Sequence, residues 1–131
     1  MCDVWWTGPT CDLLNLAPPD NEHHGLQVPN YYSWGGHAAQ DANLTWHGFF
    51  SFICNGSTLN AWTTRSSIWH ATAASVTGPY ELSDMVSQPW AHNAMLSANP
   101  SGAGYLLWQI GNSVTPPHEW ETCYEEVRTS S

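Results

Sequence analysis

The sequence has no lysine, and Arg65 and Arg128 are its only cationic side chains in 131 residues. Phosphate binding needs clustered lysine or arginine, so the composition excludes a nucleic-acid partner. The chain also lacks any apolar run near the roughly 20 residues that span a bilayer, and no membrane insertion is expected. Met1-Cys2-Asp3 has neither the basic start nor the apolar stretch of a signal peptide, as in a mature product or a fragment.

Several enzyme and metal motifs are missing as well. The sequence has no G-x-S-x-G elbow, no phosphate-binding GxxxxGK[ST] loop, no HExxH and no dinucleotide fingerprint. Its seven histidines include no pair at helical i, i+4 spacing, and no CxxC pair accompanies them. Neither a metal site nor a cofactor is therefore predicted.

What is present points to a secreted β protein. Eleven acids give a formal net charge of -9, and the nine tryptophans offer flat apolar faces that suit stacking on sugar rings. Four cysteines predict disulfides, and the sequence leaves three pairings open, of which the first two residues would close the shortest loop: Cys2, Cys11, Cys54 and Cys123. Two glycosylation sequons begin at Asn43 and Asn55 and also favour an extracellular location.

The apolar pattern predicts strands rather than helices. From Leu44 to Cys54 the even positions are mostly apolar, as in a half-buried strand, although Phe49 and Ile53 break the alternation. A second β-favouring stretch covers residues 67–74 and ends before the Gly78-Pro79 turn. Turn-rich segments between such strands indicate an all-β fold with antiparallel sheets.

The clearest hairpin joins residues 94–96 to residues 105–110 through the turn cluster at 99–102. Both faces of Tyr105–Ile110 are largely apolar, which predicts a strand covered on both sides. Residues 1–29 form an irregular lead-in, 30–111 the β region and 112–131 an acidic C-terminal segment, in which the apolar spacing predicts one short helix. These parts make a single domain or a fragment of a larger one.

Two stretches carry a family resemblance: WTTRSSIWHATAASVTGPY at residues 62–80 and WAHNAMLSANPSGAGYLLWQIG at residues 90–111. With the upstream NYYSWGG at residues 30–36, they resemble the five-bladed β-propeller glycosidases of glycoside hydrolase family 43 over about residues 30–111. The resemblance implies about two blades, whose innermost strands would meet at an axial saccharide pocket. Five blades do not fit in this length, so other copies or chains would complete the propeller.

The resemblance also bears on catalysis. Family members use three separated carboxylates, and where the second blade usually begins with Asp-Pro this chain has Asn93-Ala94. An amide cannot carry that charge, so the catalytic residues stay unidentified and the status as an enzyme stays open. Asp41, Glu81 and Asp84 match no identifiable family position, and surface turn or capping roles are expected for them. The predicted glycan-binding residues are Trp34, Arg65, His70, His92 and Asn93.

Three hypotheses follow from the sequence. The first is a secreted glycosidase-like propeller segment that binds glycans and, as part of a larger protein, hydrolyses them. The second is a non-catalytic extracellular protein, either glycan-binding or an assembly subunit, that keeps the blade fold. The third is a small disulfide-stapled β-domain without a glycan role. Arg65 lies among Trp62 and Trp69, where it could clamp an acidic sugar or stack on an indole.

Overall fold

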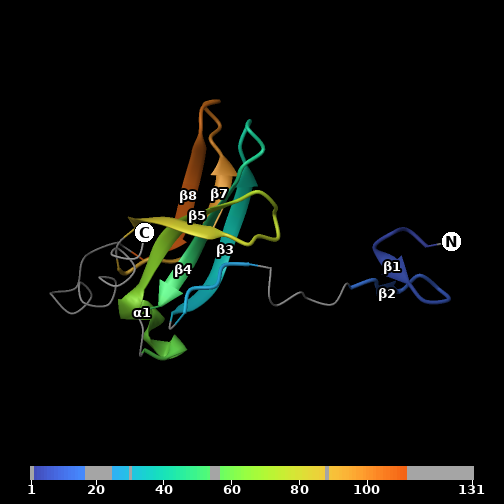
Figure 1. Ribbon diagram of the computed structural model, residues 1–131, viewed down its shortest axis with the longest axis horizontal. Coiled ribbons are helices and arrows are strands. Elements are labelled where there is room, and N and C mark those ends of the chain that lie inside the picture. The colour runs from blue at the N-terminus through green and yellow to red at the C-terminus, as the bar shows by residue number, and fades with distance from the viewer. Residues whose placement is uncertain (1, 17–24, 30, 54–56, 88, 112–131) are drawn as a thin grey trace.

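The computed structural model describes residues 2–16, 25–29, 31–53, 57–87 and 89–111. This part of the chain is all-β with antiparallel sheets, as predicted, and one short helical segment (Figure 1). The predicted C-terminal helix, Cys54, Cys123 and Asn55 lie outside the described residues. The elements are β1 (Trp6–Thr7), β2 (Leu13–Leu14), β3 (Tyr32–Gln40), β4 (Trp46–Ile53), η1 (Leu59–Ala61), α1 (Trp62–Arg65), β5 (Ser66–Ala73), β6 (Glu81–Ser87), β7 (His92–Ala98) and β8 (Tyr105–Ile110).

The largest unit is a four-stranded antiparallel sheet in the order β3-β4-β5-β6. The strand predicted from Leu44 to Cys54 is β4, and the one predicted at residues 67–74 is β5. Their register places Phe50 opposite Trp69 and Ser51 opposite Ile68. Since side chains alternate along a strand, Phe50 and Trp69 lie on one face of the sheet and Ser51 and Ile68 on the other.

One face, here called the lead-in face, holds most of the apolar core. Phe52 and Trp69 are buried there and pack against the partly buried lead-in residues Leu26 and Val28. Tyr80 extends the same core beside Ala71 and Ala73. Gly25 fastens the lead-in to the β5–β6 turn, because its N–H donates to Thr77 O (2.6 Å) and its carbonyl accepts from Tyr80 N (2.9 Å).

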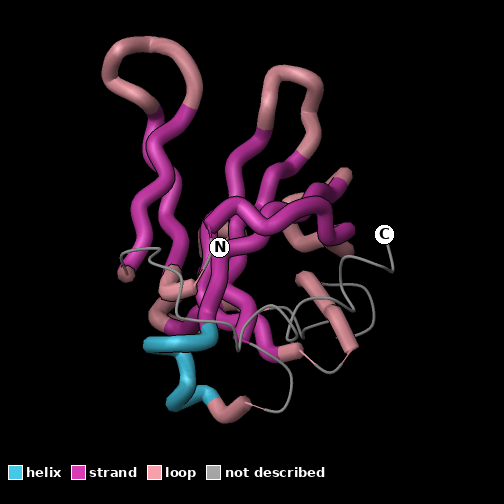
Figure 2. Tube along the Cα trace, turned by 90° about the vertical axis from the view of Figure 1, so that its left-hand side faces the viewer, coloured by secondary structure: helices cyan, strands magenta, loops and turns pink. Residues whose placement is uncertain are grey.

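The opposite face, here called the hairpin face, is covered in part by the β7–β8 hairpin. The hairpin is the one predicted from residues 94–110, and its loop lies at the same end of the molecule as the β3–β4 loop (Figure 2). A second core of Ile68, Ala91 and Ala94 lies beneath it, with Phe49 packed against this core. The hairpin explains why Phe49 and Ile53 break the alternation of β4, since that strand is covered on both faces.

The far side of the hairpin differs from the expectation for residues 105–110. In the described part of the chain only one face of β8 is covered, through Leu107. The other face of the hairpin leaves four large apolar side chains exposed: Met95, Leu106, Trp108 and Ile110. The apolar pattern of β8 therefore reflects one buried face and one apolar stripe open to solvent.

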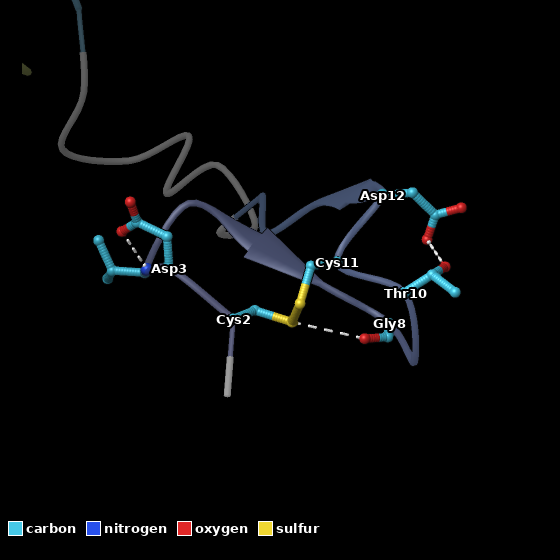
Figure 3. Close-up of a disulfide and its surroundings, with 7 residues drawn as sticks. Cys2, Asp3, Gly8, Thr10, Cys11 and Asp12 are labelled. Atoms are coloured by element: carbon cyan, nitrogen blue, oxygen red, sulfur yellow. Dashed lines mark hydrogen bonds between the residues drawn. A yellow bond between two sulfur atoms is a disulfide. The ribbon is translucent and has the colours of Figure 1, made fainter.

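The N-terminal residues form a separate small hairpin of β1 and β2, drawn away from the four-stranded sheet in Figure 1. The Cys2–Cys11 disulfide closes it, as the short loop between these cysteines predicts, with an S–S distance of 2.04 Å (Figure 3). Cys11 has a φ of 57° at the end of the turn. A covalent link thus stabilises a segment whose large side chains, such as Trp5 and Leu16, are exposed.

Candidate functional site

The junction of β3 and β7 is the first candidate site, and three hydrogen bonds set its geometry. The Asn93 N–H donates to Ser51 Oγ at 2.8 Å, and the Leu96 N–H donates to His37 Nδ1 at 2.7 Å. At the start of β7, Ser66 Oγ and His92 Nδ1 are 2.7 Å apart. His92, Asn93 and Leu96 of β7 thus contact β5, β4 and β3 in turn. The hairpin therefore crosses the sheet obliquely and reaches β3 at His37.

Trp34 and Asn93, two of the predicted site residues, lie on neighbouring segments at this junction. The register of β3 shifts between Trp34 and Gly36, and the intervening Gly35 has a φ of 56°. The positive φ favours glycine at this position, and a Cβ added there would lie 2.5 Å from Asn93 Oδ1 and displace the amide. Trp34 is 53% exposed, and Asn93 is exposed on the adjoining strand. An indole face and a primary amide are therefore open to solvent on adjoining strands.

His92 lies at the junction too, but its ring is 5% exposed and contacts protein rather than solvent. The ring centroid lies 5.0 Å from that of Trp62, and burial lowers the pKa of His92. Arg65 follows Trp62 at the end of α1, where its Nη1 donates to Ser57 Oγ at 3.1 Å. His92 thus fixes the start of β7 against Ser66 and Trp62, whereas Arg65 contacts Ser57, just before η1.

His70 belongs to a different group of polar side chains on the hairpin face, closer to the β3–β4 turn. Its Nε2 lies 2.9 Å from His47 Nδ1, and its Nδ1 lies 3.6 Å from Asp84 Oδ1. At the other end, His47 Nε2 lies 3.3 Å from Asp41 Oδ2. The four side chains form a continuous row, Asp41-His47-His70-Asp84, across β4, β5 and the adjoining turn and strand. This histidine row is the second candidate site.

The hydrogen count of the histidine row follows from its contacts. His47 needs a hydrogen on Nε2 to donate to Asp41, and one more hydrogen must lie between the two rings. Two neutral imidazoles supply these two ring hydrogens. The His70 Nδ1–Asp84 Oδ1 separation of 3.6 Å is longer than a hydrogen bond, so this end of the row is a looser contact.

Asp41 also stabilises the β3–β4 turn through hydrogen bonds to the backbone. Its Oδ1 accepts the backbone N–H groups of Asn43 (3.0 Å) and Thr45 (2.8 Å). The hydrogen bond from Thr45 lowers the pKa of Asp41 most, and those from His47 and Asn43 act in the same direction, whereas burial opposes them. Asn43, the first predicted glycosylation residue, is exposed in this turn.

The sequence alone did not point to His37, His47, Ser51 and Ser66 as residues of these sites. Their partners are set by strand register and by the crossing of the hairpin, and neither can be read from one sequence. The signal present was the alternation of β4, in which His47, Phe49 and Ser51 share the hairpin face. Polar residues on the second face of a strand covered on both sides mark positions that need partners.

Two features of the described residues bear on the class of site. No group of three or more His, Cys, Asp or Glu side chains is placed to hold a metal ion in that part of the chain. The helical segments of the same residues include none long and apolar enough to cross a membrane. No family model, no curated protein and no solved structure matches the chain.

Proposed function

We propose that the chain binds carbohydrate at the β3–β7 junction of an extracellular β protein. The observation that carries the proposal is the close approach of Gly35, the neighbour of the half-exposed Trp34, to the exposed amide of Asn93. An indole stacks on the C–H face of a sugar ring, and an amide both donates to and accepts from hydroxyl groups. Gly35 and the Asn93–Ser51 hydrogen bond hold the two elements close before any ligand arrives.

The strand arrangement supports the propeller hypothesis for the same region. Gly35 lies near Asn93 and His37 near Leu96, so β3 and β7 run side by side in the same direction. Successive propeller blades begin with inner strands that are neighbours in this way, each followed by an antiparallel meander. We infer that β3 to β6 correspond to one blade and β7 with β8 to the beginning of the next, and that further copies or chains would complete the ring.

Binding without hydrolysis is the activity that fits the junction. Glycoside cleavage needs two carboxyl groups on opposite sides of the scissile bond, roughly 5 to 10 Å apart. The described acids beside the hairpin face are Asp41, Glu81 and Asp84, and Asp41 and Asp84 are engaged in the histidine row. We expect no turnover of aryl glycosides by this chain. Turnover that disappears in Asp41→Asn or Glu81→Gln would contradict this expectation.

The test is a calorimetric titration of the full chain with neutral pentose and hexose oligosaccharides and with uronic-acid oligosaccharides. Trp34→Ala is expected to weaken binding about tenfold or more, since stacking on an aromatic face contributes on the order of 1 kcal/mol or more. Trp108→Ala is the matched control, because Trp108 is 55% exposed but lies on the outer face of the hairpin. Equal losses in the two variants, or no binding by the parent chain, would overturn the proposal.

A second candidate function is assembly with other chains, favoured by the exposed stripe of Met95, Leu106, Trp108 and Ile110. Contiguous apolar side chains on a strand surface are common in interfaces. Sedimentation of the chain over a range of concentrations, with Trp108→Gln for comparison, separates the two candidates. Association that Trp108→Gln abolishes, combined with no saccharide binding, would favour assembly over carbohydrate recognition.

A further inference from the structure

Two histidines contribute to the contact between the β7–β8 hairpin and the sheet, His37 on β3 and His92 at the start of β7. His37 Nδ1 accepts the Leu96 N–H at 2.7 Å, and a ring nitrogen can accept only when it carries no hydrogen. The ring of His37 therefore holds its hydrogen on Nε2. Protonation would place a second N–H donor opposite the Leu96 N–H and remove this hydrogen bond.

His92 makes the corresponding contact at the other end of the interface. Its buried ring lies 2.7 Å from Ser66 Oγ and packs on Trp62, and the adjoining Ala91 N–H donates to Ser66 O at 3.0 Å. Burial of the ring lowers the pKa of His92, so the folded contact disfavours the imidazolium. Acid therefore disfavours both the Leu96–His37 contact and the buried position of His92.

The surrounding titratable groups make the hairpin contact the part that responds to acid. Residues 92–110 contain no Asp, Glu, Lys or Arg, so His92 and Tyr105 are the only ionisable side chains of the hairpin. On the strands beneath, β3 contributes Tyr32 and His37, β4 and β5 contribute His47 and His70, and β6 contributes Glu81 and Asp84, with Asp41 in the β3–β4 turn and Arg65 just before β5. Histidine is the side chain whose ordinary titration lies between about pH 5 and 8.

The contact between β4 and β5 is of a different kind, because it is a backbone ladder that runs from the pair Trp46 and Ala73 to the pair Ile53 and Ser66. Its amide hydrogen bonds do not depend on a neutral histidine. The ladder is therefore the reference against which the acid response of the hairpin is compared.

We propose that mild acid releases the β7–β8 hairpin from the sheet through protonation of His37 and His92. Release moves Asn93 away from Gly35 and Trp34 and so takes the junction apart. The release itself needs no ligand. Its consequence, loss of bound carbohydrate in acid, rests on the proposed function.

The test is amide hydrogen exchange by NMR on the full chain without sugar, at about pH 7.5 and about pH 5, on either side of the ordinary histidine range. The Leu96 and Asn93 amides are expected to lose about tenfold or more of their protection factor in acid, as the loss of a buried hydrogen bond predicts. The Asn93 amide is informative because its acceptor, Ser51 Oγ, does not titrate. Amides of the β4–β5 ladder serve as the internal control and are expected to keep their protection.

The matched variants are His37→Asn and His92→Asn, alone and combined. An Asn side-chain oxygen can take the place of the Nδ1 acceptor and does not titrate in this range. The double variant is expected to keep its Leu96 protection in acid. Unchanged protection in the parent chain, equal loss in the β4–β5 ladder, or an unaltered acid response in the double variant would each overturn the proposal.

A measurement on the unaltered chain covers the case in which the double variant does not fold. The ¹⁵N shifts of His37 at about pH 7.5 report which ring nitrogen carries the hydrogen, and the expected form has it on Nε2. Hydrogen on Nδ1 would overturn the proposal. If the hairpin is released in acid but the chain binds no saccharide at neutral pH, only the proposed function is refuted.

Discussion

The two faces of the four-stranded sheet are held by different forces. On the lead-in face, Phe52 and Trp69 pack against the apolar side chains of Leu26 and Val28. On the hairpin face, Ser51, Ser66 and His37 hold the β7–β8 hairpin through hydrogen bonds above a smaller apolar core. Apolar burial supplies stability without direction, whereas hydrogen bonds fix position.

The difference explains why the candidate sites lie on the hairpin face. A polar group that is buried must find a partner, and each partner on this face fixes where β7 crosses the sheet. Ser51 is the cross-strand partner of Trp34 and accepts the Asn93 N–H, so it links the strands that carry these two residues. We therefore expect substitutions on the lead-in face and on the hairpin face to have separable effects.

The largest expected effect tests the apolar face. Phe52 is 1% exposed, and Phe52→Ala should lower the free energy of unfolding by about 3 to 5 kcal/mol through lost burial and the cavity left behind. Phe49→Ala is the matched control, because Phe49 is partly buried on the hairpin face and should cost less. Urea unfolding followed by tryptophan fluorescence measures both. A greater loss for Phe49→Ala would reverse the assignment of the main core.

A smaller loss is expected from the polar contacts. Ser66→Ala leaves the buried His92 Nδ1 without its partner, at a cost of about 1 to 3 kcal/mol. Ser97→Ala removes the hydrogen bond from the exposed Trp108 indole and should lower the free energy of unfolding by only about a few tenths of a kcal/mol. The same urea titration compares the two. Equal effects would show that the Ser66–His92 contact does not hold the hairpin.

Third in size is the pH dependence of stability. His92 has a lowered pKa, so the unfolded chain binds a proton more readily, and stability is complete above the ordinary value of 6.5 and falls as the pH drops below it. Urea midpoints measured from about pH 8 down to about pH 5 should decline, and His92→Asn should flatten part of that decline. A rise in stability on acidification would give the wrong sign for this group.

The smallest effect is expected at the β3–β4 turn. Asp41 has a lowered pKa, so its contribution is complete above the ordinary value of 3.8 and is lost as the pH falls below it. Asp41→Asn keeps an oxygen for the Thr45 and Asn43 N–H groups but removes the charge that faces His47. A modest loss at neutral pH that shrinks as the pH falls below 3.8 is expected in thermal unfolding. A loss of equal size at both pH values would assign the effect to the turn alone.

Much of the sheet could be predicted from local patterns, and much of the site could not. The alternation of β4 and the turn at residues 99–102 gave the strands and the hairpin, and the short Cys2–Cys11 loop gave the disulfide. The strand β6 was not predicted, because its residues are mostly polar or exposed and show no clear apolar alternation. The histidine row depends on the register that sets Phe49 opposite His70, a non-local fact that a single sequence does not hold.

Carbohydrate recognition at the β3–β7 junction is tested most directly by NMR during titration with the oligosaccharide that binds best. The account predicts that the Trp34 indole N–H and the Asn93 side-chain amide shift together and saturate, while the Trp108 indole N–H, which donates to Ser97 Oγ on the far side of the hairpin, stays in place. Shifts confined to Trp108, or none at Trp34 and Asn93 when the sugar is bound, would contradict it.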